Sequence, residues 1–161
     1  MQKSHTMLTD KPYTCKNLSP FYLYGMNETK RYAVSIKNHE EIVNALTQFC
    51  KDKKIKGGQI IGIGAVKSAT LRFFNPSTKQ YVDKTFDEQM EIANLTGNIS
   101  LMDGDVYLHL HATFGREDYT AIAGHLLKAT LNGAGEFIVT NYSLTLPRVK
   151  NSKIGLNVFD F

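Results

Sequence analysis

Three histidines carry the clearest chemical signal in this chain. His109 and His111 are separated by one residue within the run Val106–Thr113, and His125 follows fourteen residues after His111. If that run is a β-strand, alternate residues share one face, and the two imidazoles project together about 7 Å apart along the backbone. A returning segment would have to bring His125 beside them. Three imidazoles with a fourth position left open suit a Zn²⁺ ion that binds water or a substrate.

The spacing alone does not decide between a metal site and a solvated strand face. Two histidines separated by one residue are equally expected as polar side chains facing water, so both interpretations stay open at this point. A closed structural zinc site usually has four ligands, often thiolates. Neither Cys15 nor Cys50 lies near the histidines in the sequence, and we expect His5 and His39 on the surface.

Charged residues near the histidines are candidates for a supporting role. The acids Glu117, Asp118 and Glu136 could orient a ligand imidazole or carry a proton for metal-bound water. For each acid taken singly, we favour the simpler interpretation of a surface charge. Arg116 could neutralise an anionic ligand bound near the histidines. The sequence assigns no catalytic residue.

Two further motifs receive structural interpretations. The glycines of Gly57-Gly58 and of Gly62-x-Gly64 could suggest a phosphate-binding loop, but Lys67 stands where a dinucleotide motif has its third glycine. We therefore predict a bulge or a close strand crossing at the glycines. The lysine run within residues 51–56 is better explained as the basic end of a helix than as a phosphate contact.

Composition limits the classes of protein to which the chain can belong. With 161 residues, 42% hydrophobic and 21% charged, it can bury one core, and no stretch approaches the roughly 20 apolar residues needed to cross a bilayer. The amino-terminal residues lack an apolar leader segment, so we expect a cytoplasmic protein with no membrane partner. Its net charge of +4 permits nucleic-acid binding without requiring it. Both cysteines are expected to be free thiols, with Cys50 in the core.

The periodicity predicts one helix and a long series of strands. His39, Glu40 and Glu41 open an amphipathic helix, which we expect Gly57-Gly58 to end. One helix followed by many strands indicates an α+β domain with a mainly antiparallel sheet. The tail 155–161 could be a last strand or a contact with a partner. The strands are expected at residues 21–26, 31–36, 59–66, 69–74, 84–93, 97–102, 106–113 and 136–145.

Several ordered motifs then resemble one family. The run Leu95–Ser100, the pair Asp103-Gly104, the run Leu108–Ala112 and the run Gly124–Leu127 together resemble the PPC domain, the "plants and prokaryotes conserved" domain. Residues 62–66 and 91–92 also fall where that family has equivalents, so the resemblance covers roughly residues 21–143. One departure is Ala123, where the family commonly has a second glycine before the histidine.

The resemblance implies an antiparallel sheet with few helices, a homotrimer, and a metal held by His109, His111 and His125. Zinc is the metal that we expect. Plant members carry Arg-Gly-Arg-Pro segments that grip the DNA minor groove, and no such segment occurs in this sequence. We expect residues 1–17 to be a flexible amino-terminal segment and residues 18–161 to form a single PPC-like domain.

Three functions follow as alternatives. The first is a trimeric, metal-binding module that serves as a DNA-binding or regulatory protein, with nucleic acid or a small-molecule ligand as partner. The second is a zinc-dependent lyase or hydrolase that acts on a small oxygen-rich metabolite at the three histidines. The third is a structural oligomer whose histidines hold a metal or an anion between subunits without turnover.

Overall fold

The computed structural model describes residues 29–161, which form one eight-stranded sheet and one helix. The predicted fold class, α+β with a mainly antiparallel sheet, is confirmed. The pairing order is β3-β2-β6-β5-β4-β7-β8, with β1 added on β6, and only β4 and β7 pair in parallel. The elements are β1 (Lys30–Ile36), α1 (Ile42–Asp52), β2 (Gly58–Asn75), β3 (Gln80–Phe86), β4 (Met90–Met102), β5 (Asp105–Gly115), β6 (Ala121–Asn141), β7 (Pro147–Asn151) and β8 (Leu156–Phe159).

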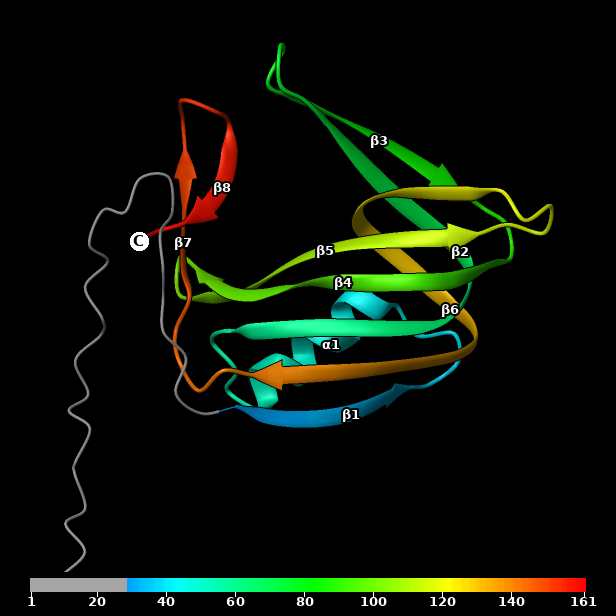
Figure 1. The fold of residues 1–161 in the computed structure, drawn as a ribbon, viewed down its shortest axis with the longest axis horizontal. Helices are drawn as coiled ribbons and strands as arrows, with labels where there is room; N and C mark the ends of the chain where they lie inside the picture. Colours follow the sequence, from blue (N-terminus) through cyan, green and yellow to red (C-terminus); the bar gives the residue numbers. More distant parts are fainter. Residues whose placement is uncertain (1–28) are drawn as a thin grey trace, which may run out of the picture.

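Four strands form a closed circuit. β2 pairs with both β6 and β4, and β5 joins β4 to β6. The circuit closes because β2 and β6 are long and bend, so that each reaches two neighbours along its length (Figure 1). Two hairpins extend this circuit: β2 with β3, and β7 with β8, both rising on the same side in Figure 1.

The bend of β2 lies at the glycines that the sequence marked as a bulge or crossing. The β2–β4 register shifts between Gly62 and Gly64, and the β2–β6 register shifts just beyond Gly64. A Cβ at Gly62 would overlap the ring of Phe137 on β6. Gly64 has φ +156 and no room for a side chain beside Ala134. Glycine is therefore required by the close approach of two strands, as predicted.

The helix covers the core with one apolar stripe. Ile42, Leu46 and Cys50 follow one another at four-residue intervals and are all 0% exposed. Glu41 is the N-cap: its carboxylate accepts hydrogen bonds from the backbone N–H groups of Val43 and Asn44, and also from that of Ala129 on β6. The helix is thus anchored to the sheet at its first residue. Cys50 is a buried free thiol, as expected, whereas Cys15 lies outside the described residues.

Both predicted helix ends need correction. The helix begins at Ile42, because His39 has a positive φ of 71 and Glu41 is used as the cap. It ends at Asp52, before Gly57-Gly58 is reached. Lys54 adopts a left-handed φ of 53, and the N–H of Ile55 donates to the carbonyl of Cys50 while that of Lys54 donates to Lys51. This Schellman motif, closed by the buried Ile55, terminates the helix without glycine.

Several predicted strand boundaries were wrong. The runs 59–66 and 69–74 form one strand, because Ser68 between them remains paired with Thr130 on β6 and the register only shifts between Val66 and Ser68. The run 84–93 is two strands, since a turn separates Phe86 from Met90. β6 begins at Ala121, well before the predicted 136, and ends at Asn141.

At the two ends of the chain, one strand is added and one prediction remains outside the structure. β7 was not predicted from the sequence, and the tail forms the strand β8. The predicted strand 21–26 and the flexible segment 1–17 lie outside the described residues. In residues 29–161 there is no helix of the length and apolarity that crossing a membrane requires.

Candidate metal centre

The register of β5 and β6 brings the three histidines together. His109 and His111 alternate on β5, and His111 lies directly opposite His125 in the antiparallel pair. The ring centroids are separated by 5.2 Å for His109 and His111, 5.1 Å for His109 and His125, and 5.4 Å for His111 and His125. The returning segment that the sequence required is therefore the first half of β6.

A polar row crosses the sheet through this cluster. Residues that face one another in neighbouring antiparallel strands share a face of the sheet. The register pairs Thr96 of β4 with His111, His111 with His125, and His125 with Arg72 of β2. His109 lies one step along, opposite Asn98 of β4. The histidines therefore lie on the face whose neighbouring positions are polar, and this face is opposite to that of the buried Leu110 and Leu126.

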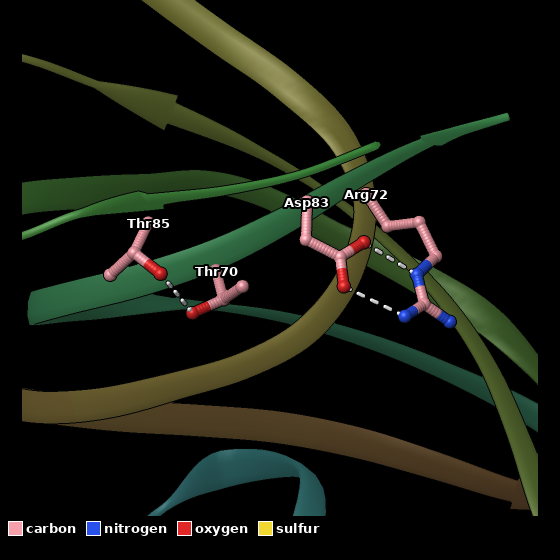
Figure 2. Close-up of polar contacts among 4 residues, drawn as sticks. All are labelled: Thr70, Arg72, Asp83 and Thr85. Carbon is pink, nitrogen blue, oxygen red and sulfur yellow. Dashed lines mark hydrogen bonds and ion pairs between the residues drawn. The ribbon is translucent and has the colours of Figure 1, made fainter. Parts of the chain in front are cut away.

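An ion pair fixes the strand beside His125. The guanidinium of Arg72 donates two hydrogen bonds to the carboxylate of Asp83 on β3, at 2.7 and 2.8 Å (Figure 2). The hydroxyls of Thr70 and Thr85 lie 3.0 Å apart one step further along the same two strands. Arg72 also lies over the ring of Tyr81. These contacts hold the β2–β3 hairpin in register next to the histidines, although the pair itself is largely exposed and adds little to stability.

The surroundings of His109 and His125 favour their neutral forms. The pKa of His125 is lowered from 6.5 to about 4, first by burial and then by the charges of His109, His111 and Arg72, while the carboxylate of Asp83 opposes this shift. Burial, followed by the charges of Arg148 and His111, also lowers the pKa of His109. A neutral imidazole is the form that donates a lone pair to a metal, so these environments favour metal ligation over protonation.

The donor geometry fits a small divalent cation. One ring nitrogen from each histidine can be chosen so that all lie within 4.8 Å of one another. Two nitrogens on one zinc ion lie at most about 4.2 Å apart, because each Zn–N bond is about 2.1 Å. Small side-chain rotations would therefore bring the three nitrogens onto one ion. His111 is exposed, whereas His109 and His125 are partly buried, so the cluster is open to ligands from one side.

The other candidates from the sequence lie elsewhere. Arg116 is paired with Glu88, so its charge is already neutralised by the protein itself. Asp118 accepts hydrogen bonds from Thr120 within its own turn, as a loop residue would. Glu136 lines a groove on another part of the sheet. Within residues 29–161, the histidine cluster contains no carboxylate.

Sequence reasoning missed Arg148 on β7. It is only 8% exposed, donates through Nε to Ser100 Oγ at 3.0 Å, and lies between the rings of Tyr107 and Phe159. In the sequence, Arg148 was one of four scattered arginines. No local pattern signalled it, because its partners come from β4, β5 and β8.

An apolar groove lies on another part of the sheet, where residues 61–63 of β2 and 136–138 of β6 line it. It has a volume of about 540 Å³ and is lined by residues of β1, β2, β4 and β6. Its large side chains are unusually accessible for their type, with Ile61, Ile63 and Ile138 exposed by 45%, 57% and 40%. A contiguous exposed apolar surface of this kind often marks a site where another molecule binds.

Comparisons with known proteins identify the same family that the motifs suggested. Residues 24–143 match the sequence profile of the Plants and Prokaryotes Conserved (PCC) domain. No curated protein sequence matches the chain.

Solved structures match over most of the chain. A candidate DNA-binding protein from Bacteroides thetaiotaomicron is 60% identical, with a TM-score of 0.80 over 85% of this chain and 99% of that one. A metal-containing protein from Archaeoglobus fulgidus is 26% identical, with a TM-score of 0.80 over 88% and 100% of the two chains. A plant- and prokaryote-conserved protein from Pyrococcus horikoshii is 26% identical, with a TM-score of 0.77 over 86% and 95%.

Proposed function

Since the chain belongs to the Plants and Prokaryotes Conserved domain family, we propose that it is a trimeric metal-binding protein whose His109, His111 and His125 hold zinc. The observation that carries this proposal is the convergence of three imidazoles from two strands, with their donor nitrogens within 4.8 Å. The lowered pKa values of His109 and His125 support it, because both rings are available as neutral ligands at neutral pH. The name of the Archaeoglobus fulgidus protein, a metal-containing relative, supports it as well.

A bound zinc ion would supply a Lewis acid with one position free for a water or an oxygen ligand. The chain itself would supply three neutral donors on a rigid two-strand platform. The Arg72–Asp83 pair would hold the neighbouring hairpin beside His125.

Metal analysis of the purified protein tests the proposal. We expect about one zinc per chain in the wild-type protein and its loss in His109→Ala, because two remaining imidazoles bind zinc much more weakly than three. His39→Ala is the matched control, since His39 is exposed and lies outside the cluster. Equal zinc content in His109→Ala and the wild-type protein would refute the assignment.

The apolar groove supports the trimer. Ile61, Ile63 and Ile138 expose a surface that a second copy of the chain could cover. We expect Ile138→Asp to sediment as a monomer, because a buried carboxylate without a partner is unfavourable at an interface. Ile154→Asp is the control: Ile154 is 47% exposed but lies in the β7–β8 hairpin, away from the groove. A wild-type protein that sediments as a monomer would refute the trimer.

Nucleic-acid binding is a second candidate function. It is favoured by the name of the Bacteroides thetaiotaomicron protein and by the net charge of +4. Fluorescence anisotropy with labelled duplex and single-stranded DNA is the direct measurement. Binding that weakens steeply between 50 and about 200 mM salt is expected for a regulator of this kind, and no binding at low salt would eliminate it.

The alternative of a zinc-dependent lyase or hydrolase is ranked below these. Its support is the open position at the cluster. The nearest carboxylate in electrostatic terms, that of Asp83, is held by Arg72 and is poorly suited to act as a general base. Turnover of a small oxygen-rich metabolite by the zinc-loaded protein, absent in His109→Ala, would reverse this ranking.

A further inference from the structure

Arg148 is a buried arginine without a carboxylate partner. Within residues 29–161 it forms no ion pair, although its residue is only 8% exposed. Its guanidinium carbon lies 5.2 Å from the centroid of the Tyr107 ring and 4.5 Å from that of Phe159. Burial without a counter-charge is unfavourable, and it lowers the pKa of Arg148. A guanidinium in this setting interacts strongly with any anion that reaches it.

The guanidinium is held in one orientation with one nitrogen left over. Nε donates to Ser100 Oγ at 3.0 Å, and Nη1 donates to the backbone carbonyl of Asn157 at 2.8 Å. Nη2 has no protein partner in the described part of the chain. Arg148 therefore holds its guanidinium in a fixed orientation, with Nη2 not used by any partner among residues 29–161. A fixed guanidinium with a nitrogen to spare is the arrangement that binds an oxyanion tightly.

Arg148 packs against residues on the same face of the sheet as the histidines. Tyr107, against which Arg148 stacks, is two residues before His109 on β5, so both side chains point to one side of the sheet. Ser100, which holds Nε, is directly opposite Tyr107 in the β4–β5 register.

Two hairpins flank this face and meet at their tips. Arg148 lies in the β7–β8 hairpin and Arg72 in the β2–β3 hairpin. The two hairpins themselves can be followed in Figure 1. At Gly155, an added Cβ would lie 3.3 Å from the Cβ of Lys79 and 3.6 Å from the ring of Phe74. The tips of the two hairpins are therefore in contact, and the lysine brings a further positive charge to this contact.

From this arrangement we infer that the face between the three histidines and Arg148 binds a small oxyanion, a carboxylate with a neighbouring oxygen, whose negative charge meets Nη2 of Arg148. The inference rests on the proposed function, because the metal at the histidines supplies the second contact. Neutral imidazoles leave the charge of a divalent cation uncompensated, and the cluster contains no carboxylate among the described residues. The ligand must then bring the negative charge.

A cobalt-substituted protein gives a test that needs no enzymatic turnover. Co²⁺ bound by the histidines has a visible absorption spectrum that changes when a ligand enters its open position. We would titrate the Co²⁺ protein with glycolate, with its uncharged analogue glycolamide, and with inorganic phosphate. The variants are Arg148→Gln and Arg148→Lys, and the matched control is Arg116→Gln, whose arginine is paired with Glu88 away from the site.

We expect glycolate to bind the wild-type protein at least tenfold more tightly than glycolamide. Arg148→Gln should weaken glycolate binding roughly tenfold or more, Arg148→Lys should fall between, and Arg116→Gln should match the wild-type protein. Stronger binding of phosphate than of glycolate, with the same dependence on Arg148, would support the oxyanion site and assign it to phosphate esters.

Three results would overturn the inference. Equal affinity for glycolate and glycolamide in the wild-type protein excludes a charge-recognising site, and this comparison stands even if the Arg148 variants do not fold. A normal Co²⁺ spectrum with unchanged glycolate affinity in Arg148→Gln refutes the role of Arg148 but leaves the metal site intact. Failure of the wild-type protein to bind Co²⁺ refutes the proposed function, and the inference with it.

Discussion

Acidification of the metal-free protein should destabilise it through His125. Burial lowers the pKa of this residue from 6.5 to about 4 in the folded protein. Between these values the unfolded chain takes up a proton that the folded chain does not, so the free energy of unfolding falls as the pH falls from 6.5 to 4. Above pH 6.5 both states are neutral, and the contribution of His125 is constant.

The magnitude follows from the difference between the two pKa values. A shift of this size corresponds to a ceiling of about 3.4 kcal/mol, at about 1.36 kcal/mol per pKa unit. His125 is only partly buried, and solvent screening reduces the effect. We therefore expect a loss of about 1 to 3 kcal/mol in the free energy of unfolding across this pH range.

Urea denaturation in the presence of a chelator measures this loss. The wild-type protein and His125→Gln would be unfolded at pH 7.5, 6.5, 5 and 4, so that the contributions of titrating groups outside the histidine cluster cancel in the comparison. The difference in unfolding free energy between them should change by about 1 to 3 kcal/mol in favour of the variant as the pH falls. Parallel pH profiles for the two proteins would refute the claim that the fold holds His125 in its neutral form.

Three further predictions concern the scaffold and are measured by urea denaturation at neutral pH. Leu46→Ala should lower the free energy of unfolding by about 2 to 5 kcal/mol, because Leu46 is 0% exposed and its removal leaves a cavity. Asn44→Ala, on the exposed side of the helix, should change it little. A loss below about 1 kcal/mol for Leu46→Ala would contradict the assigned core. Gly62→Ala should destabilise the protein by about 1 to 3 kcal/mol through overlap with Phe137, whereas Gly115→Ala, where a Cβ meets nothing within 4 Å, should be tolerated; equal effects would argue against the close strand crossing. Glu41→Ala should lower the free energy of unfolding by about 1 to 2 kcal/mol, because three backbone N–H groups lose their acceptor, while Glu40→Ala should be near neutral. A larger loss for Glu40→Ala than for Glu41→Ala would refute the assignment of Glu41 as the helix cap.

The positions of the histidines were predictable only in part. Strand periodicity predicted that His109 and His111 share a face, and the structure agrees. The residues around His125 in the sequence did not predict that it lies opposite His111, because that pairing depends on the register between β5 and β6. The family motifs, not the periodicity, joined the third histidine to the first two.

Errors at element boundaries have identifiable physical causes. The sequence suggested a glycine stop for the helix, but Lys54 accepted a left-handed conformation because the buried Ile55 closes the Schellman motif. The sequence predicted β6 only from Glu136 onward, at its carboxyl-terminal end. Gly124, Gly133 and Gly135 interrupt the alternation of side chains, and the pairing with β2 shifts register between Leu131 and Gly135.

Arg148 was beyond the reach of sequence reasoning for a different reason. Its environment is built from Ser100, Tyr107, Asn157 and Phe159, which lie on three other strands. A buried arginine is recognised by its partners, and these partners lie between Ser100 and Phe159, far apart in the sequence. Only the assembled fold reveals them.

The bent strand β2 has a consequence for how the chain folds. Its partners on β6 are roughly 50 to 80 residues away in the sequence, from Arg72 with His125 to Gly58 with Asn141. Such distant pairings form only after a large loop has closed, and closing the loop lowers the entropy of the chain before any contact stabilises it. Folding should therefore be slow compared with that of a helical domain of this size. Because β2 also pairs with β3 and β4, its amide protons should exchange with solvent only when the whole domain opens. The histidine face therefore needs β2, β4, β5 and β6 together: the site exists only once β6 has been synthesised and has closed the circuit.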